Sequence, residues 1–169
     1  MKRWSLLIAP LVALALSGCA GYRLAGSKPA GMVNVSKLYV PTFENATLEP
    51  RLGALVTNAV IKQIQATNAY QIVSESEADA TLKGTIGTIN RTQWRSVETN
   101  TLQTTELLMR LKIDFKVVNK AGVRIYGGKT QATSYVVLDP NWQTSERQLL
   151  SETAERLSVI LSDDLANGW

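Results

Sequence analysis

Histidine is absent from the 169-residue sequence, and cysteine occurs once, at Cys19. Without histidine there is no histidine general base, and neither a Cys/His metal site nor a Cys-His nucleophile pair can be assembled. The phosphate-binding motif GxxxxGK[ST], the nucleophile motif GxSxG and an EF-hand calcium loop are also missing. These absences exclude most familiar catalytic constellations.

Carboxylates remain as groups that can support acid-base chemistry or calcium binding. Asp163 and Asp164 are adjacent in the last turns of a predicted helix, and Glu75, Glu77 and Asp79 lie in a polar connector. Charges grouped in this way usually form a solvated face. We therefore expect no enzymatic activity, no metal site and no cofactor.

A short apolar run near the N-terminus ends at the single cysteine. Lys2 and Arg3 give a positive start, residues 6–16 are apolar but too short to span a bilayer, and small residues follow. This pattern predicts an export signal over residues 1–18. Its end, the residues LSGC at 16–19, is similar to a bacterial lipobox, in which the cysteine is joined to diacylglycerol, the chain is cut before it and the new amine is acylated.

Cys19 is thus the expected lipidation site and the first residue of the mature protein. The alternatives are a plain signal peptide with a cysteine near the cut, or a buried core cysteine. Each buried acyl methylene contributes about 0.8 kcal/mol, so two or three chains, palmitate among them, make release from the membrane very slow. Ala20 stands where an Asp would, by resemblance to the enterobacterial sorting rule, mark inner-membrane retention. We expect a lipid-anchored protein on the outer membrane, facing the periplasm.

The mature chain has the size of one domain. Removing 18 of the 169 residues leaves 151, which is enough to form a hydrophobic core.

The mature chain is only mildly basic. Lys2 and Arg3 are removed with the signal, so the formal charge falls from +4 to +2, and nucleic acid is not an expected partner. Residues 19–34 are rich in Gly, Pro, Ala and Ser and predict a lipidated tether, with a single domain over residues 35–169.

The first half of the domain predicts a strand, a helix and further strands. Residues 35–43 are rich in β-forming side chains, and a turn leads to Pro50, which suits the first turn of a helix. Residues 70–73 are a short strand candidate or part of a loop, and residues 80–92 predict a strand with a bulge near Gly87. The helix is indicated by apolar residues at helical spacing: Leu52, Leu55, Val56, Ala59, Val60 and Ile64.

The second half predicts a hairpin and a final helix. Residues 107–117 alternate apolar with mostly charged side chains, and residues 119–122 form a turn that returns the chain as a strand over 123–138. Ser145 and Gln148 have the spacing of a capping box. The apolar stripe of the helix that follows comprises Leu149, Leu150, Thr153, Leu157, Ile160, Leu161 and Leu165.

The element order β-α-β-β-β-α predicts an α/β fold. Each element has one apolar side to bury, which favours a two-layer sandwich with two helices on one face of a mixed, mostly antiparallel sheet of about four strands. A right-handed crossover would make the first two long strands parallel.

Three segments carry a resemblance to a known family: CAGYRL at 19–24, LYVPTFEN at 38–45 running into LEPRL at 48–52, and ADATLKG at 78–84. They resemble the LptE family, small outer-membrane lipoproteins that support lipopolysaccharide assembly. The resemblance implies a two-layer α/β domain that binds and plugs the LptD barrel. It also implies contact with lipopolysaccharide during delivery to the outer leaflet.

Lipopolysaccharide carries phosphates, which basic side chains bind well. Arg91, Trp94 and Arg95 supply two arginines and an aromatic ring beside a polar segment, and Arg110 and Lys112 begin a second basic stripe that continues to Lys116. These are the candidate lipopolysaccharide contacts. The alternative is that the charges are ordinary solvated strand residues and Trp94 a partly buried packing residue. The family's second basic residue before the final helix has no match in residues 141–144 (NWQT).

A second interpretation is open from the same residues. The segment 38–45 also resembles the opening of periplasmic lipoproteins related to curli secretion and of regulators of peptidoglycan synthases. Those proteins are self-assembling pores or regulators. A third possibility is a lipoprotein that coats the membrane without a particular activity.

Overall fold

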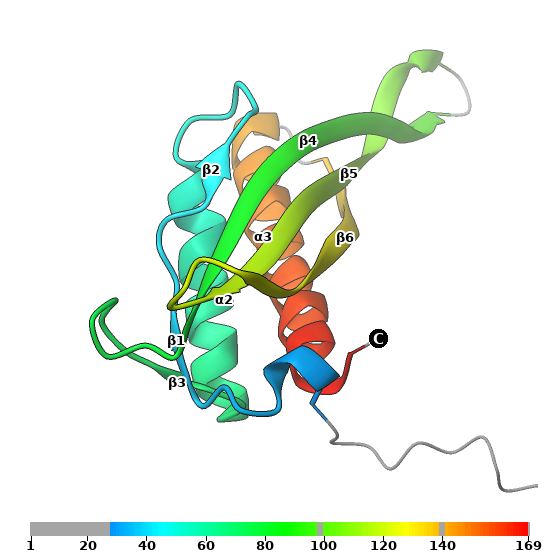
Figure 1. Ribbon diagram of the computed structural model, residues 1–169. Coiled ribbons are helices and arrows are strands. Elements are labelled where there is room, and N and C mark those ends of the chain that lie inside the picture. The colour runs from blue at the N-terminus through cyan, green and yellow to red at the C-terminus, as the bar shows by residue number, and fades with distance from the viewer. Residues whose placement is uncertain (1–27, 98–99, 139–140, 169) are drawn as a thin grey trace, which may run out of the picture.

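The computed structural model describes residues 28–97, 100–138 and 141–168 (Figure 1). The predicted signal, Cys19 and most of the expected tether lie outside these residues. The elements are η2 (Ala30–Met32), β1 (Lys37–Tyr39), β2 (Glu44–Asn45), α2 (Leu52–Thr67), β3 (Gln71–Ile72), β4 (Ala80–Val97), β5 (Asn100–Asn119), β6 (Arg124–Val137) and α3 (Trp142–Asn167).

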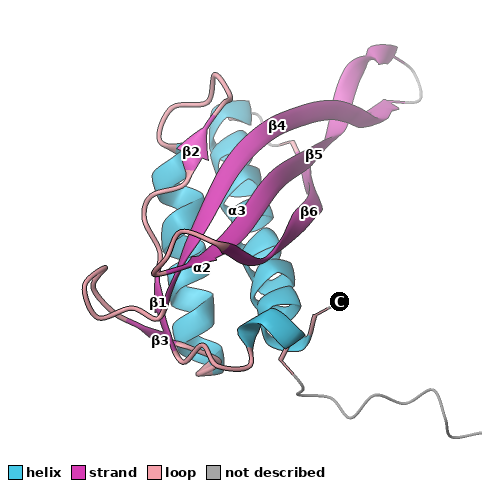
Figure 2. Ribbon diagram, viewed as in Figure 1, coloured by secondary structure: helices cyan, strands magenta, loops and turns pink. Residues whose placement is uncertain are grey.

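One mixed sheet is covered on a single face by the two helices (Figure 2). Its strand order is β3-β1-β4-β5-β6, with β2 also paired to β4. β1 and β2 run parallel to β4, whereas β4, β5 and β6 are antiparallel neighbours. The expected α/β two-layer class is confirmed, including the parallel pairing of the first strand with the next long one.

The sheet has six strands rather than about four. The segment 35–43 does not form one strand, because Phe43 leaves the sheet edge and turns into the core. Its backbone N–H donates to Thr57 Oγ1 (2.8 Å), and its ring lies against Gly84, where a Cβ would come within 2.5 Å of it. Of the predicted strand 35–43 only β1 (Lys37–Tyr39) forms, and β2 (Glu44–Asn45) lies where a turn was expected. The candidate at 70–73 is the short strand β3.

Helix α2 buries the predicted apolar face against the sheet. Leu52, Val56, Val60 and Ile64 are fully buried, whereas Leu55 is partly buried. The helix begins after Arg51, which has φ 62°, so Pro50 precedes the helix instead of lying in its first turn.

The β4–β5 hairpin confirms the predicted alternation. Buried side chains on β5 face the helices, and the residues between them, such as Lys112 and Lys116, are exposed on the open face. The register shifts between Ile86 and Thr88, which confirms the bulge near Gly87. The buried set on β5 is Met109, Leu111, Ile113, Phe115 and Val117.

Helix α3 starts at Trp142, so the expected capping box is wrong. Ser145 is buried inside the first turn, and its N–H donates to the Asn141 carbonyl oxygen (3.4 Å). Burial of the stripe is confirmed for Leu149, Thr153, Leu157, Leu161 and Leu165. Ile160 is 44% exposed, so its assignment to the buried face is wrong.

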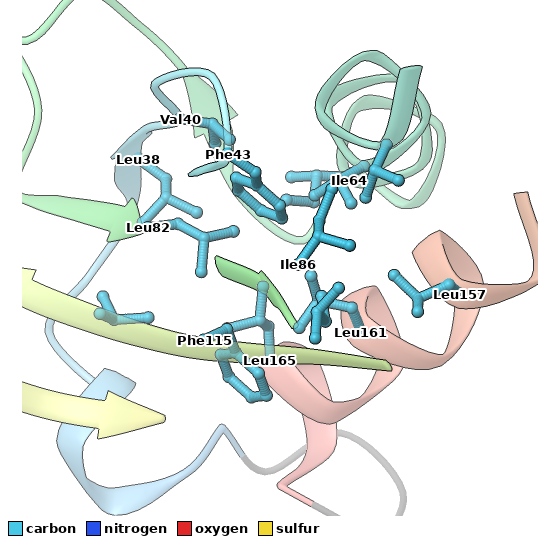
Figure 3. Packing of buried hydrophobic residues seen from close by; sticks show 14 of the residues in the cluster. Leu38, Val40, Phe43, Ile64, Leu82, Ile86, Phe115, Leu157, Leu161 and Leu165 are labelled. Atoms are coloured by element: carbon cyan, nitrogen blue, oxygen red, sulfur yellow. The ribbon is translucent and has the colours of Figure 1, made fainter. Parts of the chain in front are cut away.

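The core lies between the sheet and both helices (Figure 3). Leu38, Leu82 and Phe115 from the sheet meet Ile64 of α2 and Leu161 of α3 in one buried cluster. Residues 28–34, at the end of the expected tether, include η2, whose Met32 is fully buried in the same cluster. Within the described parts of the chain, neither helix is long and apolar enough to cross a membrane.

Candidate functional site

Strand register divides the five candidate lipopolysaccharide contacts between the two faces of the sheet. Arg91 pairs with Met109, which is buried against the helices, so Arg91 lies on the helix side. Arg110 pairs with Asn90, and Lys112 with Thr88. Both basic residues alternate with the buried residues of β5 and are exposed on the opposite, open face.

Arg91 is the centre of an ion-pair cluster on the helix side. Its Nη2 lies 2.5 Å from Glu49 Oε2 and its Nε 2.5 Å from Glu146 Oε1, and its side chain is 32% exposed. Partial burial acts to lower the pKa of Arg91, but the hydrogen bond to Glu49 and the charge of Glu146 outweigh it and raise that pKa. Two carboxylates already neutralise this cation. The ion pairs therefore explain why a partly buried arginine is stable at this position, and no bound ligand is needed.

Arg95 and Trp94 lie further along β4, toward the end of the hairpin. Arg95 Nη1 lies 3.4 Å from Glu106 Oε1, and the arginine side chain is 71% exposed. The register shifts between Gln93 and Arg95, which places Trp94 in an irregular step of the strand. Trp94 is 59% exposed and is thus accessible to a partner.

The sequence reasoning did not identify an apolar group on the open face near the same end. Leu108 on β5 pairs directly with Tyr135 on β6, and Tyr135 and Val137 are both largely exposed. Trp142 is exposed as well, but it belongs to α3 in the helix layer and not to the open face. Exposed aromatic side chains are typical of interaction surfaces. The alternation of side chains along residues 123–138 could have predicted that Tyr135 and Val137 share one face of the sheet. It could not have predicted that Tyr135 lies beside Leu108, because that depends on the register between two strands.

The rest of the open face, formed by β4, β5 and β6, carries basic side chains. Arg110 Nε donates to Thr133 Oγ1 (3.4 Å), and Lys129 Nζ pairs with Asp114 (3.2 Å). The exposed cations of this face are Lys83, Arg110, Lys112, Lys116, Arg124 and Lys129.

Two of the carboxylates considered for acid-base chemistry, Asp79 and Asp164, have structural partners. Asp164 accepts a hydrogen bond from Tyr126 Oη (2.6 Å), and Asp79 accepts from the backbone N–H groups of Ser36 and Lys37. Burial, and then the contact with Asp164, raises the pKa of Tyr126 to about 12. Among the described residues, no three acidic or sulfur side chains are grouped as a metal site would require.

Several solved structures share this fold. A lipoprotein from Caulobacter crescentus CB15 has 16% identity and a TM-score of 0.51, covering 74% of this chain and 88% of that one. A minor lipoprotein from Acinetobacter baumannii has 15% identity and a TM-score of 0.54, covering 78% and 91%. The PelC dodecamer from Paraburkholderia phytofirmans has 18% identity and a TM-score of 0.54, covering 83% and 94%. At these identities the likeness concerns the fold alone.

Comparison at the level of sequence gives one negative and one positive result. No curated protein matches the chain significantly. Residues 35–167 match the model of the LptE family, whose description is lipopolysaccharide assembly. The match spans both helices and every strand of the sheet.

Proposed function

Because this chain belongs to the LptE family of lipopolysaccharide-assembly lipoproteins, we propose that it binds and plugs an LptD-like outer-membrane barrel. In this role it assists delivery of lipopolysaccharide to the outer leaflet. The family match over residues 35–167 is the observation that carries the proposal.

The shape and polarity of the domain support a role as a plug. The β4–β5 hairpin extends beyond the helices, and the helices leave one face of the sheet open (Figure 1). That face bears hydroxyl and basic side chains, including Thr85, Lys112 and Lys116. The lumen of a large outer-membrane barrel is polar, so a polar sheet face is suited to lie against its wall.

Direct contact with lipopolysaccharide is the second part of the proposal. Arg95, Arg110 and Lys112 offer cations on or beside the open face, and Trp94 offers an exposed ring near Arg95. Arg91 is the weakest of the five candidates, since Glu49 and Glu146 occupy its guanidinium. Phosphates of the glycolipid would meet the cations, and its acyl chains would meet apolar side chains such as Tyr135.

The membrane anchor is the third part. Lipidation of Cys19 would hold the domain at the periplasmic side of the outer membrane through the tether at 19–34. The first described residue, Lys28, is nine residues beyond Cys19. An extended chain of that length reaches about 30 Å.

A pull-down of the tagged, full-length protein from detergent-solubilised outer membranes tests the barrel partnership. We expect an LptD-like barrel in about equal amount after washing, identified by mass spectrometry. Recovery of a peptidoglycan synthase would instead support the regulator interpretation, and recovery of the protein's own oligomer the pore interpretation. Recovery of neither a barrel nor another partner would contradict the proposal.

A further inference from the structure

A concave pocket of about 740 Å³ lies on the open face of the sheet, on the side away from both helices. Strands β4, β5 and β6 form its floor, and the connection between β1 and β2 forms one margin at Pro41 and Thr42. We call it the basic pocket. Its charged side chains are Lys83, Lys116, Arg124, Lys129, Glu44 and Asp114.

Two lysines lie directly opposite each other on the floor of the basic pocket. Lys83 on β4 pairs in register with Lys116 on β5, and both side chains are exposed. Like charges directly opposite on neighbouring strands destabilise a sheet. Among the described residues, neither lysine has an ion-pair partner. The pair therefore places two uncompensated positive charges side by side.

A glycine continues the same row on the third strand. Lys116 pairs with Gly127 on β6, whose φ is 148°, and a Cβ added there would lie 2.5 Å from the Phe115 carbonyl oxygen. The same Cβ position is 3.0 Å from Nη2 of Arg124. The guanidinium of Arg124 thus lies over the backbone beside Lys116, in the space that a side chain would fill. Lys83, Lys116 and Arg124 thus lie along one row that crosses β4, β5 and β6.

Each of the two carboxylates of the basic pocket has another residue of the lining as its partner. Asp114 pairs with Lys129 (3.2 Å), and Glu44 accepts a hydrogen bond from Thr85 Oγ1 (3.1 Å). Among the described residues, neither carboxylate forms an ion pair or a hydrogen bond with Lys83, Lys116 or Arg124. The basic pocket therefore carries an excess of positive charge, and Lys83, Lys116 and Arg124 supply it.

We propose that the basic pocket binds a phosphate group, with Lys83 and Lys116 on either side of it and Arg124 donating from β6. A phosphate has several anionic oxygens, so one group can accept hydrogen bonds from two ammonium groups and a guanidinium at once. Binding removes the repulsion between the lysines. The phosphate belongs to a lipid headgroup or to a soluble phosphorylated molecule. If it belongs to the transported glycolipid, the inference also rests on the proposed function.

The test uses the purified full-length protein in an uncharged detergent, without any barrel. Inorganic pyrophosphate and a short-chain phosphatidic acid are titrated by calorimetry, and thermal unfolding is followed with and without each probe. The variant is Lys83→Gln combined with Lys116→Gln. The matched control is Lys120→Gln, because Lys120 is exposed in the turn between β5 and β6 but lies outside the basic pocket.

We expect at least one probe to bind and to raise the Tm of the unmutated protein. The double variant should bind at least about tenfold more weakly, and the control should stay within about twofold. Preference for pyrophosphate indicates a soluble source, and preference for phosphatidic acid indicates a headgroup. Both outcomes support the site.

Absence of binding to both probes would overturn the inference. An equal loss in Lys120→Gln would do the same, because it would show a diffuse charge effect with no defined site. Since no barrel is present, these results are independent of the pull-down. If the pull-down recovers a barrel and neither probe binds, the phosphate site is refuted and the proposed function is not.

Discussion

Nε of Arg91 lies 2.5 Å from Oε1 of Glu146, which joins the middle of β4 to the first turns of α3. The same guanidinium contacts Glu49, in the loop before α2. One side chain therefore ties the long hairpin to the segments at the ends of both helices. This contact fixes the base of the hairpin relative to the helix layer.

Arg91→Ala should destabilise the domain. It removes the partner of two partly buried carboxylates, and hydrogen bonds to charged groups contribute about 1.5–3 kcal/mol each when one partner is lost. We expect a loss of about 1–3 kcal/mol in the free energy of unfolding, measured by urea denaturation. Arg95→Ala is the control, since that side chain is 71% exposed, and should change stability by about 0.5 kcal/mol or less. Equal losses in both variants would contradict a special role for the Arg91 cluster.

Leu111→Ala should cost about 2–5 kcal/mol, because Leu111 is fully buried at the centre of β5 and its loss leaves a cavity. Leu111→Asp should prevent folding, since it buries an unpaired charge. Circular dichroism and urea denaturation measure both effects. The neighbouring Lys112→Ala should remain close to the unmutated protein because Lys112 faces outward. A folded Leu111→Asp variant would mean that the two faces of β5 are assigned the wrong way round.

Gly127→Ala should destabilise the hairpin of β5 and β6. The added Cβ meets the Phe115 carbonyl oxygen at 2.5 Å, and the φ of 148° is strained for any L residue. We expect a loss of about 2 kcal/mol or more in thermal or urea unfolding. Gly87→Ala is the matched control, since nothing lies within 4 Å of its added Cβ. A Gly127→Ala protein as stable as the Gly87→Ala protein would contradict the geometry of β6.

Asp79 should make stability dependent on pH in the acid range. The backbone N–H groups of Lys37 (2.8 Å) and Ser36 (3.1 Å) lower the pKa of its carboxyl below the ordinary 3.8. A lowered folded-state pKa gives stability that is fully present above the unfolded-state pKa and is lost as the pH falls through the folded-state value. Asp79→Asn should therefore be less stable at neutral pH, with a difference that shrinks below pH 3.8. Denaturant titrations across that range measure it, and a constant difference would refute the linkage.

Cys19→Ala should release the protein from the membrane or leave an uncleaved precursor. Without the cysteine there is no thiol to join to diacylglycerol, and the anchoring methylenes are lost. Fractionation followed by mass spectrometry of the N-terminal peptide distinguishes the two products. A Cys19→Ala protein of mature length in the outer-membrane fraction would refute the lipid anchor.

The sequence predicted the elements whose side chains alternate or recur with a clear period. The buried face of β5 and the apolar stripe of α2 follow from period two and period 3.6, which depend only on neighbouring residues. The bulge near Gly87 was visible as a break in that alternation. The start of α3 was predicted wrongly, because Ser145 has the sequence signature of a cap but is buried by tertiary packing.

The candidate site was only partly predictable. Arg91 and Arg110 look alike as basic residues of one hairpin, yet the register that pairs Arg91 with Met109 sends them to opposite faces. Alternation within a single strand cannot reveal which residue lies across from it. For the same reason, the Lys83–Lys116 pair and the Leu108–Tyr135 contact were not visible in the sequence.

The sequence alone determined the α/β class, the faces that are buried and the resemblance to the LptE family, because these depend on local periodicity and on short motifs. Only the tertiary structure decided that Arg91 is held by Glu49 and Glu146, and that Lys83, Lys116 and Arg124 meet in one pocket. Those groupings depend on strand register and helix placement. Both are set by the packing of the whole core, in which residues distant along the chain are buried together.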